Sequence, residues 1–171
     1  FGKQKEKREK IMIEFSGPNP FKGFHIGHLR NTVIGESVSR LLQFAGYDVM
    51  PVNYLNDTGK HVAKCIWGLQ HLHKNEIHKG DKGEWLGKIY SEASILIESN
   101  PLHEEEASAI HKKLEAKDPA YTKIWEQGKK WSEEHFDSIY KDLDVHFSKV
   151  FYDSEFISSG KHVVTELAKK G

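Results

Sequence analysis

The chain has 171 residues, 37% of them hydrophobic, and its 25 basic and 25 acidic side chains give a formal net charge of zero. This length fits one domain, or one domain with a sizeable insertion, and the balanced charge does not by itself indicate a nucleic-acid-binding protein. No apolar run is long enough to span a bilayer, and residues 1–10 are charged and lack the apolar stretch of a secretory signal. We therefore expect a cytoplasmic protein with no membrane partner.

Cysteine and histidine usage argues against a structural metal. The single cysteine, Cys65, excludes an internal disulfide and a cysteine-based zinc cluster. The spacing of His71, His73 and His78 matches no zinc pattern, so we predict that no structural metal is bound. The chain starts at Phe1 rather than at a methionine, and we interpret it as an excerpt of a longer protein.

Residues 11–46 predict a strand, a loop and a helix. The apolar segment 11–15 is typical of a buried strand, and the two prolines and the glycine of residues 16–20 force a loop after it. Between residues 29 and 45 apolar side chains recur at helical spacing, and Gly46 stands where a C-terminal cap is expected. The spacing therefore predicts a helix over these residues.

A second strand follows at residues 48–55, although Pro51 is awkward there because proline cannot donate a ladder hydrogen bond. The loop 56–59 then opens a helix that runs to about His73. Strand, helix and strand in this length form the unit of a parallel sheet. We therefore predict an α/β fold: a Rossmann-like nucleotide-binding sheet of which this chain holds an incomplete half.

The pattern changes after about residue 75, where glycines and long charged amphipathic segments replace strand patterns. We predict a division into residues 1–75, the first half of the nucleotide-binding domain, and residues 76–171, a mainly helical insertion. Residues 120–143 form one predicted helix with an aromatic stripe toward the core. A short strand is expected within residues 145–152 and a last helix around residues 163–168. The side chains expected to point outward from the long helix are Lys129, Lys130, Glu133 and Glu134.

The tetrapeptide His25-Ile26-Gly27-His28 lies between the first strand and the first helix. The first turn of a helix presents unpaired N–H groups and the positive end of its dipole, which favours an anion such as a phosphate. Two imidazoles add donors for phosphate oxygens, and Gly27 lets a flat ligand lie close to the backbone. These residues predict a nucleoside triphosphate site.

The tetrapeptide and its flanks resemble one family. Residues 14–30 (EFSGPNPFKGFHIGHLR) and 52–59 (VNYLNDTG) are similar to arginyl-tRNA synthetase, a class I aminoacyl-tRNA synthetase. Gly17 and Gly23 depart from the usual serine and proline of that family, and its second signature loop, of the Lys-Met-Ser-Lys-Ser type, is not found in the 171 residues. The resemblance identifies the chain as the first half of a catalytic domain plus a connecting insertion.

The resemblance implies ATP-dependent activation of arginine to arginyl-adenylate, with Mg²⁺ in the ATP complex, and transfer of the arginyl group to tRNA(Arg) by the full-length protein. His25, His28 and Lys22 would be the catalytic residues, with His25, Gly27 and His28 binding ATP. The arginine substrate would be bound by Glu14, Ser16 and Asn19. The chain by itself is expected to be inactive.

Several simpler structural explanations stay open for these residues. Glu14 is expensive to bury in an apolar strand, so an internal salt bridge to Arg30 or Arg40 is the alternative to recognition of arginine. Lys22 is equally well explained as a solvated lysine. The second loop carries polar residues that could face the same site or cap the following helix, and capping is preferred for Asp57. These residues are Asn53, Asn56, Asp57 and Gly59.

Two other functions also remain. The chain could belong to another class I aminoacyl-tRNA synthetase or to a nucleotidyltransferase, because short His-x-Gly-His signatures occur in both. It could also be an RNA-binding module without catalysis, in which the lysine-rich insertion contacts RNA.

Overall fold

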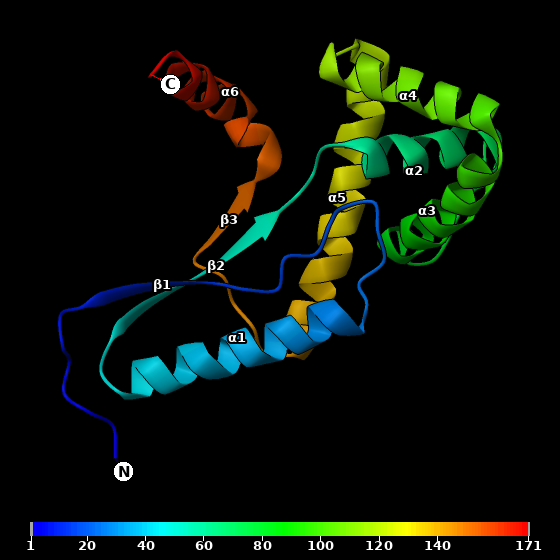
Figure 1. The fold of residues 1–171 in the computed structure, drawn as a ribbon. Helices are drawn as coiled ribbons and strands as arrows, with labels where there is room; N and C mark the ends of the chain where they lie inside the picture. The colour runs from blue at the N-terminus through cyan, green and yellow to red at the C-terminus, as the bar shows by residue number, and fades with distance from the viewer. Residues whose placement is uncertain (1, 171) are drawn as a thin grey trace.

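The computed structural model describes residues 2–170. Phe1 and Gly171 lie outside the described residues, and so does the interpretation that was based on Phe1. Three parallel strands form a sheet in the order β1 (Lys10–Glu14), β2 (Asp48–Leu55) and β3 (Lys149–Tyr152). The long helix α5 (Pro119–Asp142) separates this sheet and helix α1 (Ile26–Phe44) from a group of three further helices (Figure 1). The predicted α/β fold with a parallel sheet is confirmed.

Helix α1 joins β1 to β2 as predicted, and its buried face consists of small and polar residues. The buried residues of α1 are His28, Thr32, Gly35 and Ser39. Apolar positions used to predict the helix are exposed instead, including Ile34 at 51%. Small residues on the buried face let α1 approach the sheet closely, and a Cβ added at Gly35 would collide with the Phe15 ring. The predicted helix is confirmed, and its apolar spacing does not mark the face that is buried within the described residues.

Strand β1 is half-exposed rather than buried. Ile11 and Ile13 are half-buried, whereas Met12 is 61% exposed and Glu14 is also exposed. Successive side chains of a strand point to opposite faces, and in residues 2–170 only one face of β1 packs against other elements. The prediction of a buried strand at residues 11–15 holds for Phe15 but is wrong for Met12 and Glu14.

Pro51 is tolerated in the central strand because the backbone N–H that proline lacks would not point toward β1. It lies opposite Ile13 of β1, and its carbonyl accepts a hydrogen bond from Ser148 N at 2.8 Å, just before β3 begins. The N and the carbonyl of one strand residue point to the same side, so the absent N–H faces the start of β3 and not β1. No β1–β2 ladder bond is lost.

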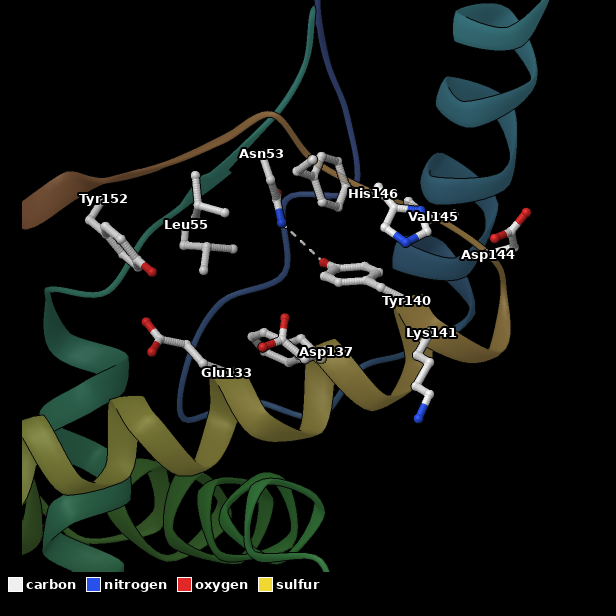
Figure 2. Close-up of a pocket in the computed structure, with 13 residues that line it drawn as sticks. Asn53, Leu55, Glu133, Asp137, Tyr140, Lys141, Asp144, Val145, His146 and Tyr152 are labelled. Atoms are coloured by element: carbon white, nitrogen blue, oxygen red, sulfur yellow. Dashed lines mark hydrogen bonds between the residues drawn. The ribbon is translucent and has the colours of Figure 1, made fainter.

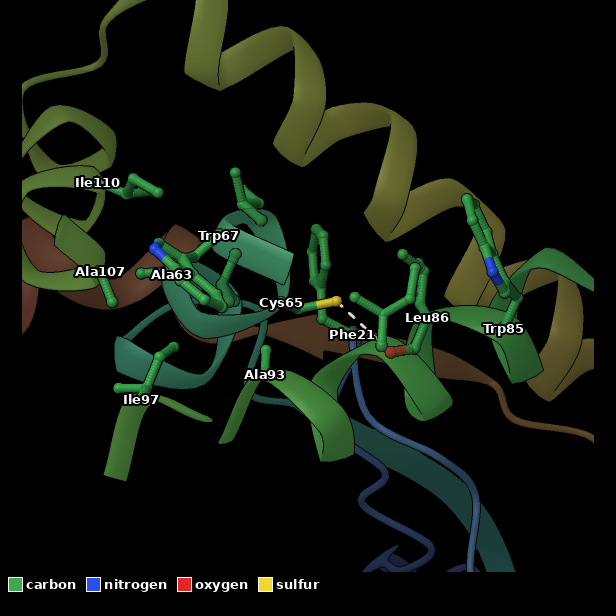
Figure 3. Close-up of a cluster of buried hydrophobic side chains, with 13 residues drawn as sticks. Phe21, Ala63, Cys65, Trp67, Trp85, Leu86, Ala93, Ile97, Ala107 and Ile110 are labelled. Carbon is green, nitrogen blue, oxygen red and sulfur yellow. Dashed lines mark hydrogen bonds between the residues drawn. The ribbon is translucent and has the colours of Figure 1, made fainter. Parts of the chain in front are cut away.

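The other helices form a second core, built around α2 (Lys60–His71), α3 (Lys82–Ser99) and α4 (Pro101–Glu115). Figure 3 shows Phe21, from the loop after β1, inserted among side chains of these helices. Phe21 is fully buried and its N–H donates to Ser132 Oγ of α5 at 2.9 Å. The helical group therefore holds the loop that leads to α1.

The C-terminal part of the chain returns to the sheet and then leaves it. Strand β3 lies in the predicted range 145–152 and pairs with β2, and helix α6 (Asp153–Lys170) follows it with no buried residue. The predicted last helix is thus confirmed, although it begins earlier. The division at residue 75 stays a prediction. Within residues 2–170 no helix combines the length and apolar character that a membrane crossing requires.

Two helical glycines provide a matched test of this packing. Gly128→Ala should lower the free energy of unfolding by about 1–3 kcal/mol, because a Cβ there would collide with the buried Phe21 ring. Gly160→Ala, where a Cβ meets nothing within 4 Å, should raise it by up to about 1 kcal/mol through helix propensity. Urea denaturation of both variants measures the difference. Equal effects of the two substitutions would contradict the position of Phe21.

Candidate functional site

The first turn of α1 is closed by the two histidines of the tetrapeptide. His25 is the N-cap residue, and its Nδ1 accepts a hydrogen bond from Gly27 N at 3.1 Å. His28 Nδ1 in turn accepts from His25 N at 3.3 Å, and the two rings stack with centroids 3.8 Å apart. A Cβ on Gly27 would lie 2.9 Å from His25 Cε1, so glycine makes room for this ring. The His25 ring lies on the side where a Cβ of Gly27 would stand, and the binding of ATP at Gly27 stays a prediction.

These contacts determine which ring nitrogens carry protons. Because both Nδ1 atoms accept backbone N–H groups, each neutral ring carries its proton on Nε2. Burial, with smaller contributions from His25 and Lys22, lowers the pKa of His28 to about 4. His28 is therefore neutral near pH 7. Among residues 2–170 no partner engages the Nε2 atom of either ring, so both can donate to an oxygen at the helix N-terminus.

A line of hydrogen bonds positions this turn. Asn53 Nδ2 lies 3.1 Å from the Tyr140 hydroxyl, which lies 2.8 Å from Ser16 Oγ. Thr32 Oγ1 lies 2.8 Å from Ser16 Oγ and 2.7 Å from the His28 carbonyl. Each hydroxyl has a single proton to donate. Every group is satisfied when each member donates to the next, from the Asn53 amide through the three hydroxyls to the His28 carbonyl. The sheet, α5 and the loop after β1 thereby fix the first turn of α1.

Ser16 occupies an unusual backbone conformation within this line. Its φ is +72°, a region costly for a residue other than glycine, and its side chain is buried. The following Gly17, at φ +63°, donates its N–H to Asn53 Oδ1 at 3.0 Å. The Ser16 hydroxyl thus has protein partners, and its assignment to substrate binding stays a prediction.

Lys22 lies beside the turn, and the structure adds a residue that the sequence analysis missed. Lys22 Nζ is 4.9 Å from the centre of the Tyr90 ring, and its charge contributes to lowering the pKa of both His28 and His61. Burial is the larger cause at His61 and brings its pKa to about 4. His61 Nε2 is buried with no hydrogen-bond partner among residues 2–170. Its place just after the loop 56–59, in the first turn of α2, was the available signal.

The side chains of Glu14 and Asn19 form no hydrogen bond or salt bridge within residues 2–170. Glu14 is exposed at the carboxyl end of β1 and forms no salt bridge within residues 2–170. Arg40 pairs with Glu36 and Asp144 instead, so the alternative of a salt bridge between Glu14 and Arg40 is wrong, and Arg30 supplies none either. Asn19 is half-buried, and only its backbone carbonyl is engaged, by Lys22 N at 3.2 Å.

Asp57 has a different role from the predicted helix cap. The N-cap residue of α2 is Gly59, without a side-chain cap. The fully buried Asp57 carboxylate instead accepts from Lys129 Nζ at 2.7 Å, Ser154 N at 2.9 Å and Ser154 Oγ at 2.7 Å. It thereby joins α5 to the first turn of α6. Capping of α2 by Asp57 is wrong because Gly59 lies closer to the helix start.

The same contact corrects the predicted outer face of α5. Lys129 is mostly buried, with an 18% exposed side chain, and Glu133 is half-buried. Both face the loop after β2 and the Tyr152 ring rather than solvent, and Lys129 Nζ lies 3.4 Å from the centre of that ring. Lys130 and Glu134 do point outward, as predicted.

A cavity of about 490 Å³ lies between α5 and strands β2 and β3 (Figure 2). Asn53 and Tyr140 line it, together with the carboxylates of Glu133 and Asp137, whose pKa values are raised by burial. The two stacked histidines do not line it, so it is separate from the turn at the start of α1.

The comparisons with known proteins agree with the motif. The family model described as tRNA synthetases class I (R), catalytic domain, matches residues 1–171. An arginine–tRNA ligase of Bdellovibrio bacteriovorus is 34% identical over 97% of this chain and 30% of its own length. One of Fusobacterium nucleatum is 37% identical over 96% of this chain and 29% of its own length. The chain thus spans about 30% of the length of these relatives.

Solved structures share the fold. An arginyl-tRNA synthetase of Plasmodium falciparum superposes with a TM-score of 0.69 at 24% identity, covering 96% of this chain and 27% of its own. One of Thermus thermophilus gives a TM-score of 0.64 at 20% identity, covering 94% of this chain and 26% of its own.

The imidazoles of His28 and His61 predict a pH dependence of stability. The folded-state pKa values of His28 and His61, about 4, lie below the ordinary 6.5. As the pH falls below 6.5 the unfolded chain therefore takes up protons that the folded chain does not. The free energy of unfolding should be highest above pH 6.5, where both rings are neutral in the folded and the unfolded chain, and it should decrease as the pH falls toward 4.

Urea denaturation between pH 7.5 and pH 4.5 tests this dependence. A His28→Asn/His61→Asn variant should show a flatter profile, whereas His162→Asn, an exposed histidine of α6, should leave the slope unchanged. Imidazole resonances of His28 and His61 that titrate near 6.5 would show that neither ring is held neutral.

Proposed function

The chain belongs to the class I tRNA synthetases (R), and from this premise we propose that its full-length protein is an arginine–tRNA ligase. The enzyme would activate arginine with ATP and transfer the arginyl group to tRNA(Arg) in the cytoplasm. The observation that carries the proposal is the pair of Nε2–H donors at the N-terminus of α1, held in place by backbone hydrogen bonds.

The proposed ATP site follows from this pair. The phosphate oxygens accept from the Nε2–H groups of His25 and His28. They also accept from those N–H groups of the first helical turn that the capping leaves unpaired, which excludes the N–H of Gly27. As the arginine carboxylate attacks the α-phosphorus, negative charge builds on the phosphate oxygens and on the leaving pyrophosphate. Fixed donors stabilise that charge without reorganising. Lys22 adds a positive charge next to His28.

A neutral His28 suits this role physically. A histidine that is already neutral needs no proton exchange before it donates from Nε2, and its buried ring is held by the Phe24 ring, 5.4 Å away between centroids. Within residues 2–170 no group of three metal-ligating side chains is placed to hold a cation. We propose that Mg²⁺ enters with the ATP phosphates rather than through a protein site.

Arginine would be recognised at the carboxyl ends of the strands. Glu14 is exposed there and unpaired within the described residues, which suits a bidentate contact to a guanidinium. Asn19 and Ser16 lie in the loop that follows, and Asn19 has a free side-chain amide for the α-amino or carboxylate group. We assign residues 1–75 to the first half of the catalytic domain and 76–171 to the connecting insertion, whose end supplies β3 to the same sheet.

The role of His28 is tested by arginine-dependent pyrophosphate exchange in the full-length protein. His28→Asn should reduce kcat by about 10²–10³-fold, the usual cost of losing one donor to a developing oxyanion. The KM for arginine should change little. His162→Asn serves as the matched control because it removes an exposed histidine far along the chain. Unchanged exchange in His28→Asn would favour the RNA-binding module without catalysis.

Substitution of Glu14 tests which amino acid the full-length protein activates. Glu14→Gln should raise the KM for arginine about 10- to 100-fold, since a hydrogen bond to a charged group contributes about 1.5–3 kcal/mol. The KM for ATP should remain within about twofold of the wild-type value. Glu9→Gln, an exposed glutamate before β1, is the control. An unaltered arginine KM in Glu14→Gln would remove the arginine assignment and favour another class I synthetase.

A further inference from the structure

A second pocket of about 490 Å³ lies on the helical side of the molecule, away from the histidine turn. One wall is α5, which contributes Lys123, Gln127 and Trp131. The opposite wall is the end of α2, the connection to α3 and the first turn of α3. We call this space the Trp131 pocket.

The Trp131 pocket is lined by flat rings. Trp131 is partly exposed there, and its ring centroid lies 6.4 Å from that of the buried Trp85. The imidazole of His78 already stacks on Trp85, with an interplanar angle of 4° and centroids 5.1 Å apart. A flat ring thus already stacks on an indole at this pocket, and a nucleobase stacks on an indole in the same geometry.

The pocket also carries positive charge that the described chain leaves uncompensated. Lys74, Lys82 and Lys123 line it, and all three are exposed and form no salt bridge within residues 2–170. Lys82 Nζ lies 4.8 Å from the centre of the Trp131 ring. The one lining carboxylate, Glu76, is already bonded to His73. Aromatic faces beside free lysines suit a base joined to a phosphate.

The walls of the pocket are held together before any ligand binds. The carboxylate of Asp81, the N-cap of α3, bonds to His135 Nδ1 of α5 at 2.7 Å. A Cβ on Gly83 would collide with His135, so α3 and α5 are packed closely next to the pocket. A preformed pocket loses little free energy to ordering when its ligand binds.

We propose that the Trp131 pocket binds an unpaired nucleotide of RNA, with its base stacked on Trp131 and its phosphates held by the lining lysines. That this RNA is an unpaired segment of the tRNA rests on the proposed function. The pocket's preference for a base with a phosphate follows from its own side chains. It adds a contact on the helical group that is separate from the ATP and arginine sites.

Photo-crosslinking of the full-length protein tests the location. The probe is a single-stranded RNA of eight nucleotides that carries 5-iodouridine and a fluorescein label. Mass spectrometry of the digested complex should find the crosslink on Trp131 or His78. Crosslinks found only outside the pocket residues would overturn the proposal.

Fluorescence anisotropy with the same RNA tests the chemistry. A Lys82→Ala/Lys123→Ala variant should weaken binding at least tenfold, and the slope of log affinity against log salt should become shallower by about 1.4, or about 0.7 for each lost phosphate contact. Both side chains are exposed, so the variant keeps its fold, and Lys130→Ala, an exposed lysine of the same helix, should stay within twofold of wild type. An unchanged slope would overturn the proposal.

Two further experiments distinguish a nucleotide site from a surface for acidic polypeptides, and the pocket proposal from the proposed function. Poly-glutamate that competes as well as unlabelled RNA would identify a surface for acidic polypeptides and overturn the nucleotide assignment. His28→Asn should lose pyrophosphate exchange while keeping the crosslink. A crosslink that persists when exchange is unaffected by His28→Asn would contradict the proposed function and leave the pocket assignment supported.

Discussion

The position of the histidine turn depends on one line of hydrogen bonds that runs from Asn53 through Tyr140, Ser16 and Thr32 to the His28 carbonyl. These groups come from β2, α5, the loop after β1 and α1, and they are buried. Leaving one member unsatisfied costs about 1–3 kcal/mol, so the line favours a single arrangement. Because that arrangement places a non-glycine residue at positive φ, the turn is held in a conformation that the loop alone would rarely adopt.

The helical group is connected to the same region at two points. Phe21 inserts into the helical core next to Lys22, and the buried Asp57 carboxylate binds Lys129 and the start of α6. Removing one partner of a buried ion pair costs about 3–5 kcal/mol, because the other charge is left uncompensated. The helices therefore contribute to the placement of the loops at the carboxyl ends of the strands, in addition to any ligands that they contact themselves.

Local patterns predicted the three strands and helices α1, α2, α5 and α6, but neither α3 and α4 as separate helices nor every buried face. The boundaries of β2, the position of α1 and the single long helix α5 follow from turn residues and periodicity in the sequence. The exposed apolar side of α1 and the buried Lys129 depend on which distant segments pack there, and periodicity carries no such information. The same limit applies to the site: His25 and His28 were found from their motif, whereas the contributions of His61 and Tyr140 depend on contacts between residues far apart in the sequence.

The central claim is that the imidazoles of His25 and His28, at the start of α1, donate from Nε2 to the phosphates of ATP. A crystal structure of the full-length protein with a non-hydrolysable ATP analogue measures this directly. The account predicts phosphate oxygens within about 2.7–3.2 Å of Nε2 in both His25 and His28, with each Nδ1 still accepting its backbone N–H group. Phosphates bound elsewhere, or rings turned so that Nδ1 faces the ligand, would contradict it.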